Sequence, residues 1–363
     1  MGNVEVRNLY KKFEDVTAIR GLNLTVSEGE FLVLLGPSGC GKTTTLRCIA
    51  GLEVPDEGEI YIDNKLVNNV PPKDRNVAMV FQNYALYPHM NVYKNLAFPL
   101  KMRKYSNSEI DKRVKEVATL LKIEHLLNRR PRQLSGGEAQ RVALGRALVR
   151  NPAVFLMDEP LSNLDAKLRL FMRAELKRMQ KDVGTTTIYV THDQAEAMTM
   201  GDRIAIMNEG ILQQIATPED AYNHPSNFFV AGFLGSPPMN FIDCAFKEKN
   251  GHYILDASEF QLEIAETIGE ELKSTGIEEI ILGIRPEDIT LHNRPIKPNA
   301  IQGEVYIYEP LGSELIVDLK VGKNLIKIKS SPSHKIKIGD MSWMTFDQNR
   351  IHIFDKKTGK TLV

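Results

Sequence analysis

A glycine-rich turn placed directly after an apolar run limits the folds that this 363-residue chain can adopt. Residues 36–43 read Gly-Pro-Ser-Gly-Cys-Gly-Lys-Thr, and residues 31–35 before them read Phe-Leu-Val-Leu-Leu. The apolar run predicts a buried strand, and residues 42–50 are compatible with a helix. A strand, a glycine-rich turn and a helix in this order predict a phosphate-binding loop, because glycine lets backbone N–H groups come close to phosphates.

Two side chains of this loop carry the chemistry expected of it. Lys42 would add a positive charge beside the β- and γ-phosphates, and the hydroxyl of Thr43 would be a ligand of Mg²⁺. The alternative is a glycine-rich turn that holds no ligand. The residues predicted to contact the nucleotide here are Gly36, Pro37, Ser38, Gly39, Cys40, Gly41, Lys42, Thr43 and Thr44.

Bulk properties narrow the class of protein. The length suits two domains, and 46 basic residues balance 46 acidic ones, so charge gives no sign of a nucleic-acid partner. Apolar stretches fall short of the roughly 20 residues that a membrane helix needs, and the N-terminus lacks a signal-peptide apolar region. Three cysteines without metal-ligand spacing suit free thiols. We expect a cytosolic or peripheral protein that does not bind nucleic acid.

The order of apolar and helical segments predicts an α/β fold. Unalternating runs at residues 153–157 and 187–190 flank a helical segment at 166–181, which indicates a buried parallel sheet. Two amphipathic helices are predicted before them, at residues 108–121 with an N-capping serine and at 138–149.

The last third of the chain has a different pattern. Residues 235–238, Gly-Ser-Pro-Pro, are typical of a linker. Short strands separated by turns follow, which indicates a small barrel or sandwich. The predicted strands are residues 280–284, 302–308, 315–319, 325–329 and 351–354.

Two acids follow the second apolar run. Asp158 and Glu159 stand at the carboxyl end of a predicted parallel strand, the edge at which open α/β sheets bind ligands. Asp158 suits the Mg²⁺ shell, directly or through water, and Glu159 can orient or deprotonate an attacking water. The alternative is a polar strand end that only caps the sheet.

A second anion-binding turn opens the helix after residue 134. Residues 134–138 read Leu-Ser-Gly-Gly-Glu, followed by Gln140 and Arg141, and Ser135, Gly136 and Gly137 supply a hydroxyl and close N–H groups. With both turns present, the whole chain resembles the ATP-binding subunit of ABC transporters, and among these it is most similar to sugar importers of the maltose and glycerol-phosphate type.

The resemblance implies an architecture. Residues 1–235 would form a P-loop NTPase ABC cassette with a mostly parallel sheet, an antiparallel β subdomain and a helical subdomain at about 88–152. Residues 236–363 would form an OB-like, TOBE-type regulatory domain, and the alternative there is a dimerisation module without a ligand.

The resemblance also assigns roles to single residues. Phe13 takes the position that stacks on adenine, where similar importers often have Trp or Tyr, and Asp165 belongs to a loop, residues 162–165, that reaches a second monomer. His192 matches the histidine that contacts the γ-phosphate. Gln82 matches the glutamine that senses Mg²⁺ and the γ-phosphate, and residues 82–90 would line the docking groove for a membrane permease subunit.

The mechanism implied by the resemblance needs two copies of the chain. They would sandwich two ATP molecules, each with Mg²⁺, so that Ser135 and Gly137 of one copy face the γ-phosphate held by Lys42 of the other. Permease subunits would bind this homodimer at the cytoplasmic face of the membrane, and a solute-binding protein would act indirectly.

Alternatives remain at three levels. Importers of polyamines, sulfate or iron carry comparable tails, so sugar is one of several solute classes. A soluble ABC ATPase that is not coupled to transport is a second alternative. A small-molecule P-loop kinase is the third, although it would not need residues 134–138.

Overall fold

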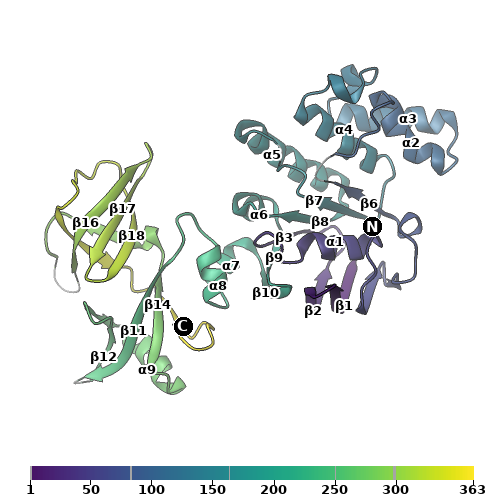
Figure 1. Ribbon diagram of the computed structural model, residues 1–363. Helices are drawn as coiled ribbons and strands as arrows, with labels where there is room; N and C mark the ends of the chain where they lie inside the picture. The colour runs from purple at the N-terminus through teal and green to yellow at the C-terminus, as the bar shows by residue number, and fades with distance from the viewer. Residues whose placement is uncertain (1, 82–83, 163, 250, 297–299) are drawn as a thin grey trace. The chain divides into compact units, whose positions relative to one another are not determined.

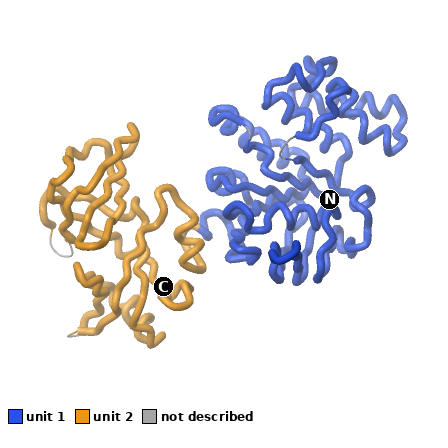
Figure 2. Tube along the Cα trace, in the orientation of Figure 1, with its two compact units in different colours: residues 1–221 blue, residues 222–363 orange. Residues whose placement is uncertain are grey.

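The computed structural model describes residues 2–81, 84–162, 164–249, 251–296 and 300–363. The chain divides into two compact units, Met1–Ala221 and Tyr222–Val363 (Figure 2). Each unit has a hydrophobic core of its own. The predicted linker at residues 235–238 lies within the second unit, and the predicted domain boundary between residues 235 and 236 stays a prediction.

The first unit is built on a six-stranded sheet with the order β10-β9-β3-β8-β7-β6 (Figure 1). All pairs are parallel except that of β10 with β9. Every residue of β3 is buried, which explains its unalternating apolar sequence, and the predicted α/β fold is confirmed. The strands are β3 (Phe31–Leu35), β6 (Val77–Val80), β7 (Val154–Asp158), β8 (Thr186–Thr191), β9 (Arg203–Asn208) and β10 (Ile211–Ala216).

Helices and a second sheet cover the two faces of this sheet. On one face, Leu46 of α1 (Lys42–Ala50) shares a core with Leu32 of β3 and Leu9 of an antiparallel sheet ordered β2-β1-β4-β5. On the other, Phe31 lies beneath α5 (Ala166–Val183), where Nζ of Lys177 is 5.3 Å from its ring centroid, and α6 (Gln194–Met200) packs beside α5. The antiparallel strands are β1 (Val4–Phe13), β2 (Val16–Val26), β4 (Glu57–Ile62) and β5 (Lys65–Leu66).

A group of three helices has a separate core, formed by α2 (Val92–Met102), α3 (Asn107–Leu120) and α4 (Gly136–Leu148). The predicted cap of α3 is corrected here. Ser106 is the N-cap, in a capping box with Glu109, so the helix starts before the predicted Ser108. Short 3-10 turns lie at η1 (Pro72–Asp74), η2 (Glu124–Leu126), η3 (Pro131–Gln133) and η4 (Pro286–Asp288).

The second unit contains two five-stranded antiparallel sheets, ordered β13-β12-β11-β14-β20 and β15-β19-β16-β17-β18, around one shared core. The five predicted strands are present as β14, β16, β17, β18 and β20, but five others and the helix α9 (Glu266–Thr275) were not predicted. Two short helices precede the sheets, α7 (Pro218–Asn223), which crosses the division between the units, and α8 (Phe228–Phe233). The strands are β11 (Asn240–Lys249), β12 (His252–Asp256), β13 (Gln261–Ile264), β14 (Glu279–Ile284), β15 (Ile289–His292), β16 (Ile301–Pro310), β17 (Leu315–Val321), β18 (Asn324–Ser330), β19 (Met341–Phe346) and β20 (His352–Asp355).

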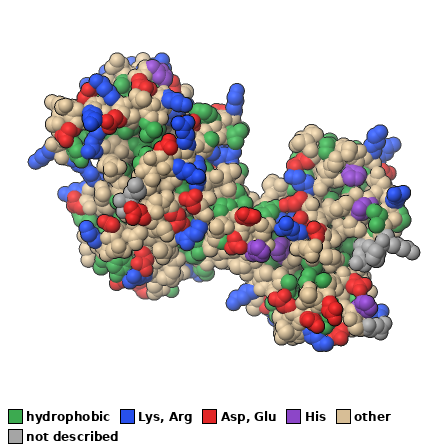
Figure 3. Space-filling view, turned by 180° about the vertical axis from the view of Figure 1, so that it is seen from behind, with side chains coloured by type: hydrophobic (Ala, Val, Ile, Leu, Met, Phe, Trp, Pro, Cys, Tyr) green, Lys and Arg blue, Asp and Glu red, His purple; other side chains and the backbone are tan. Residues whose placement is uncertain are grey.

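The surface is mixed in charge. On the face shown in Figure 3, basic and acidic side chains are interspersed over both units. The charge balance of the sequence is therefore also a local balance on this face. Within the described ranges, no helix is both long and apolar enough to cross a membrane.

Candidate nucleotide site

The predicted phosphate-binding loop connects the carboxyl end of β3 to α1. A Cβ atom on Gly41 would lie 2.3 Å from the carbonyl oxygen of Ala18, and one on Gly36 would lie 2.2 Å from the carbonyl oxygen of Met207. Both distances exclude a side chain, so these two glycines allow the loop to pack between β2 and β9. The backbone of the loop is thus fixed from both sides.

The first turn of α1 presents backbone donors. Its N-cap is Gly41, which has φ of 100° and offers no side-chain oxygen to the N–H groups of this turn. By contrast, side-chain oxygens of Ser135, Asp165 and Asp193 cap α4, α5 and α6. N–H groups that lack a side-chain cap at the positive end of a helix bind anions such as phosphate.

Lys42 is only 5% exposed, and the loop itself orients its ammonium group. Nζ donates to the carbonyl oxygens of Gly36 at 2.8 Å and Pro37 at 2.7 Å, and lies 3.6 Å from Sγ of Cys40. Because the thiol of Cys40 is buried in the core, this residue can meet a nucleotide only through its backbone. The remaining loop residues are more accessible: Ser38 and Gly39 are exposed, and Thr44 is half-buried.

Thr43 and Asp158 form a pair of oxygen ligands. The Thr43 hydroxyl donates to Oδ1 of Asp158 at 2.7 Å. Asp158 ends β7 and is 8% exposed, so burial raises the pKa of its carboxyl group, an effect that the Thr43 hydrogen bond opposes. In the part of the chain that the structure describes, no group of three or more His, Cys, Asp or Glu could hold a metal ion. Hydroxyl and carboxylate oxygens are ligands of the kind that Mg²⁺ prefers, so this pair could hold that ion.

Glu159 and His192 are in direct contact. Nδ1 of His192 lies 3.1 Å from Oε1 of Glu159. Glu159 has φ of 44°, an uncommon conformation for a residue with a Cβ, and its N–H donates to the carbonyl oxygen of Val190 at 3.0 Å. Because β7 and β8 are neighbours, both side chains reach the same edge of the sheet. An acid and an imidazole in contact can act on one water or phosphate oxygen.

The second predicted anion site is the start of α4. Ser135 is the N-cap, in a capping box in which its Oγ accepts from the N–H of Glu138 at 3.4 Å. Ser135 and Gly136 are exposed, but Gly137 is buried, and a Cβ there would lie 2.7 Å from Cδ2 of Leu168. A Cβ at position 137 would therefore require the Leu168 side chain on α5 to shift, and the predicted contact of Gly137 with phosphate stays a prediction.

Two further predicted contact residues are exposed. The ring of Phe13 is at the end of β1, 41% exposed, and Nζ of Lys11 lies 5.1 Å from its centroid. Such a ring is available to stack on a base. Asp165 caps α5, with Oδ1 accepting from the N–H of Leu168 at 3.0 Å. Its role toward a second monomer stays a prediction.

The predicted permease groove begins at Gln82, which lies outside the described residues. Further along, the ring of Tyr87 packs on Phe98 with centroids 4.8 Å apart, and the guanidinium of Arg146 lies 5.3 Å from the Tyr87 ring. The N–H of Tyr87 donates to Oδ1 of Asn95 at 2.9 Å. This segment is thus anchored on α2 and α4, and its docking role stays a prediction.

Sequence reasoning missed Arg169. Its Nη2 donates to the carbonyl oxygens of Ser162 at 3.3 Å and Leu164 at 2.9 Å, and its Nη1 lies 3.6 Å from Oδ2 of Asp193. Arg169 follows Asp165 by four positions on α5, which places both on one face of the helix. That spacing was the available signal.

Comparisons with known proteins identify the family of the chain. Three family models match: ABC transporter at residues 19–162, MalK OB fold domain at 235–289 and TOBE domain at 282–354. The chain is 55% identical to the trehalose/maltose import ATP-binding protein MalK of Thermococcus litoralis, over 100% of both chains. It is 48% identical to the oligosaccharides import ATP-binding protein MsmX of Bacillus subtilis, over 99% of each.

Among solved structures, the chain is similar to a dimeric ATP-binding cassette in a post-hydrolysis state, bound to ADP and Pi. The match covers 59% of this chain and 98% of that cassette. The TM-score is 0.54 and the sequence identity 36%. The 55% identity to MalK over the full length of both chains and the three matched family models together show the family. This chain belongs to the ATP-hydrolysing subunits of ABC transporters, in the MalK-like family.

Proposed function

We propose that this chain powers a sugar importer by hydrolysing ATP at sites shared between two copies of itself. One observation carries the proposal: the Thr43–Asp158 pair and the Glu159–His192 pair stand together at the carboxyl edge of the central sheet, beside the loop that holds Lys42. Cation, metal ligands and general base are the groups that phosphoryl transfer to water needs.

Each residue has a proposed role at this edge. Lys42 and the first turn of α1 bind the β- and γ-phosphates. Thr43 and Asp158 would hold Mg²⁺, together with Gln82, which lies outside the described residues. When bound, Mg²⁺ neutralises charge on the phosphate oxygens. Glu159 orients the attacking water and accepts its proton, and His192 contacts the γ-phosphate. The ring of Phe13 stacks on the adenine, and this contact contributes about 1 kcal/mol to the free energy of binding.

The second copy completes the site. Ser135 and Gly136 are exposed at the positive end of α4, so they are open to a phosphate held by another chain. The dimeric relative with ADP and Pi supports this arrangement. ATP at the interface stabilises the closed dimer, and loss of phosphate after hydrolysis removes that stabilisation.

Membrane partners follow from the same scheme. Permease subunits dock at residues 82–90, so the chain works as a peripheral protein at the cytoplasmic face of the membrane, with a solute-binding protein as an indirect partner. Residues 236–363 act as a regulatory domain that pairs two copies. The names of the relatives, which refer to trehalose, maltose and oligosaccharides, support sugars as the solute class.

Uptake by cells that lack this gene tests the solute class. Plasmids would restore either the wild-type chain or Lys42→Ala, and labelled maltose, trehalose, spermidine, iron and sulfate would be offered in parallel. We expect sugar uptake to depend on the wild-type chain, with the other solutes unaffected. Loss of spermidine, iron or sulfate uptake instead would favour those importers, and unchanged uptake of all five would favour an ATPase not coupled to transport.

Phosphate release by the purified chain tests the reaction type. With Mg-ATP and no added acceptor, the wild-type chain should release inorganic phosphate continuously. A chain that releases phosphate only when a small-molecule acceptor is added would behave as a kinase.

A further inference from the structure

We infer that Arg169 is a positioning residue that couples the loop at residues 162–165 to the reacting groups Glu159 and His192. The inference rests on the proposed function, because that loop is the segment proposed to meet the second copy. Arg169 joins Ser162 and Leu164 of this loop to Asp193, the residue that follows His192. A change at the interface would therefore reach the site through it.

The contacts form a closed ring. The hydroxyl of Ser162 donates to the carbonyl oxygen of Glu159 at 2.9 Å, and Nη2 of Arg169 donates to the carbonyl oxygen of Ser162 at 3.3 Å. Nη1 of Arg169 then lies 3.6 Å from Asp193. His192, the next residue, returns to Glu159 with Nδ1 at 3.1 Å from Oε1. A ring of this kind links the loop to both reacting groups.

Asp193 is rigidly attached to the strand end. Its Oδ1 accepts from the N–H of Glu196 at 3.2 Å, and its own N–H donates to Oγ1 of Thr191 at 3.0 Å. Thr191 in turn donates to Oε2 of the buried Glu196 at 2.8 Å. These bonds hold the residues on both sides of His192. A displacement of Asp193 would therefore also displace the His192 imidazole.

The guanidinium suits this task better than any other side chain. It donates to two carbonyl oxygens and reaches a carboxylate at the same time, whereas an ammonium group is a single point. The Arg169–Asp193 pair has about a third of the arginine side chain and a quarter of the aspartate side chain exposed, 32% and 26%. A pair so exposed contributes little to folding. We infer that the pair acts by fixing the position of Asp193. Breaking it should therefore lower turnover without a large loss of stability.

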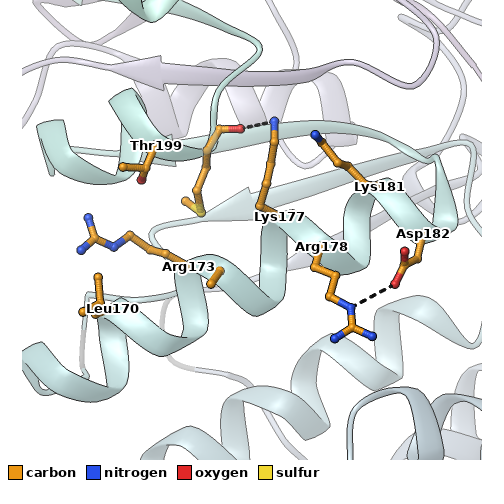
Figure 4. A pocket seen from close by; sticks show the side chains of 9 residues that line it. Leu170, Arg173, Lys177, Arg178, Lys181, Asp182 and Thr199 are labelled. Carbon is orange, nitrogen blue, oxygen red and sulfur yellow. Dashed lines mark hydrogen bonds and ion pairs between the residues drawn. The ribbon is translucent and has the colours of Figure 1, made fainter.

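Lys177 provides a matched control. Like Arg169, it joins α5 to α6. Its Nζ donates to the carbonyl oxygen of Met200 and to Oδ1 of Asp202, both at 2.6 Å. Figure 4 shows Lys177 on α5 reaching the end of α6, along the groove that Arg173 and Lys181 also line. Both of these hydrogen bonds go to residues that are not members of the ring. The Lys177→Ala variant should therefore weaken the contact between α5 and α6 while the ring of contacts stays intact.

The test compares Arg169→Ala, Arg169→Lys and Lys177→Ala in the full-length chain. ATP affinity is measured by titration, kcat and KM by phosphate release, and folding by thermal melting. We expect Arg169→Ala to bind ATP within about twofold of the wild type but to lose at least tenfold in kcat. Arg169→Lys, which keeps the charge, should also lose most of its turnover, and Lys177→Ala should stay within about twofold of the wild type.

Three results would overturn the inference: unchanged kcat in Arg169→Ala, full turnover in Arg169→Lys, or an equal loss in Lys177→Ala. If Arg169→Ala does not fold, Arg169→Lys and the control decide alone. The wild-type chain tests the proposed function separately, because it must release phosphate whatever the variants do.

Discussion

At the scale of single residues, nucleotide affinity should depend most on Lys42. Its ammonium group is buried within the loop, where two carbonyl oxygens hold it beside the first turn of α1, the turn proposed to bind the phosphates. We expect Lys42→Ala to weaken ATP binding at least tenfold, about 1.4 kcal/mol, in a calorimetric titration. Lys65→Ala, which removes an exposed cation of β5, is the control. Equal affinity in the two variants would contradict the role given to Lys42.

Asp158 leads to a prediction about pH. Burial raises the pKa of its carboxyl group, so the folded chain holds this proton more tightly than the unfolded chain does. The contribution to stability is therefore complete below the ordinary pKa of 3.8 and is lost as pH rises through the raised value. Asp158→Asn removes the buried charge and keeps an acceptor for Thr43.

Without nucleotide, we expect Asp158→Asn to melt at a higher temperature than the wild type at pH 7, and the difference to vanish in acid. Its ATP hydrolysis should fall by roughly a hundredfold, because an amide cannot neutralise the metal. Melting curves across pH, with phosphate release as the second measurement, check both parts. A lower melting temperature at pH 7 would show that the carboxylate is stabilised rather than penalised by its surroundings.

The contacts among these residues set the limit of prediction from sequence. The loop, the two acids and His192 could be found because each follows an apolar strand or matches a motif. The Thr43–Asp158 and Glu159–His192 contacts depend on which strands are neighbours, and that order is not written locally in the chain. Arg169 was missed because two of its partners are backbone oxygens and the third, Asp193, lies 24 residues further on, so only its spacing from Asp165 pointed to it.

At the scale of elements, the start of α3 gives a direct test of the corrected cap. Ser106→Ala removes the oxygen that accepts from the N–H of Glu109 and should cost about 1 kcal/mol in the free energy of unfolding. Ser108→Ala, two positions further on, changes an exposed residue inside the helix and should cost less than about 0.5 kcal/mol. Urea unfolding compares them. A larger loss of unfolding free energy in Ser108→Ala would show that Ser108 is the N-cap, as the sequence predicted.

Elements were predicted where their environment leaves a clear pattern. Strands β3, β7 and β8 are buried on both faces and therefore read as apolar runs. In the second unit, β11 carries Lys247, Glu248 and Lys249 at its exposed end, and β13 is only four residues long. Such strands resemble polar loops in sequence, because tertiary pairing rather than local hydrophobicity makes them strands.

At the scale of the whole molecule, we expect one chain to hold only half of each ATP site. The exposed positions Ser38 in the phosphate-binding loop and Gly136 at the start of α4 should meet across two copies. Cysteine substitution reports on this, because the natural Cys40, Cys48 and Cys244 are all buried. A Cβ on Gly136 meets nothing closer than 3.7 Å, so the substitution is tolerated sterically.

The most direct measurement is disulfide cross-linking between two different chains, one carrying Ser38→Cys and the other Gly136→Cys, both with Glu159→Gln to prevent hydrolysis. The two chains are mixed, oxidised and separated by size under denaturing conditions. We predict a cross-linked pair that forms with Mg-ATP and not with Mg-ADP. Cross-linking that is equally weak with both nucleotides would contradict a site shared between two copies.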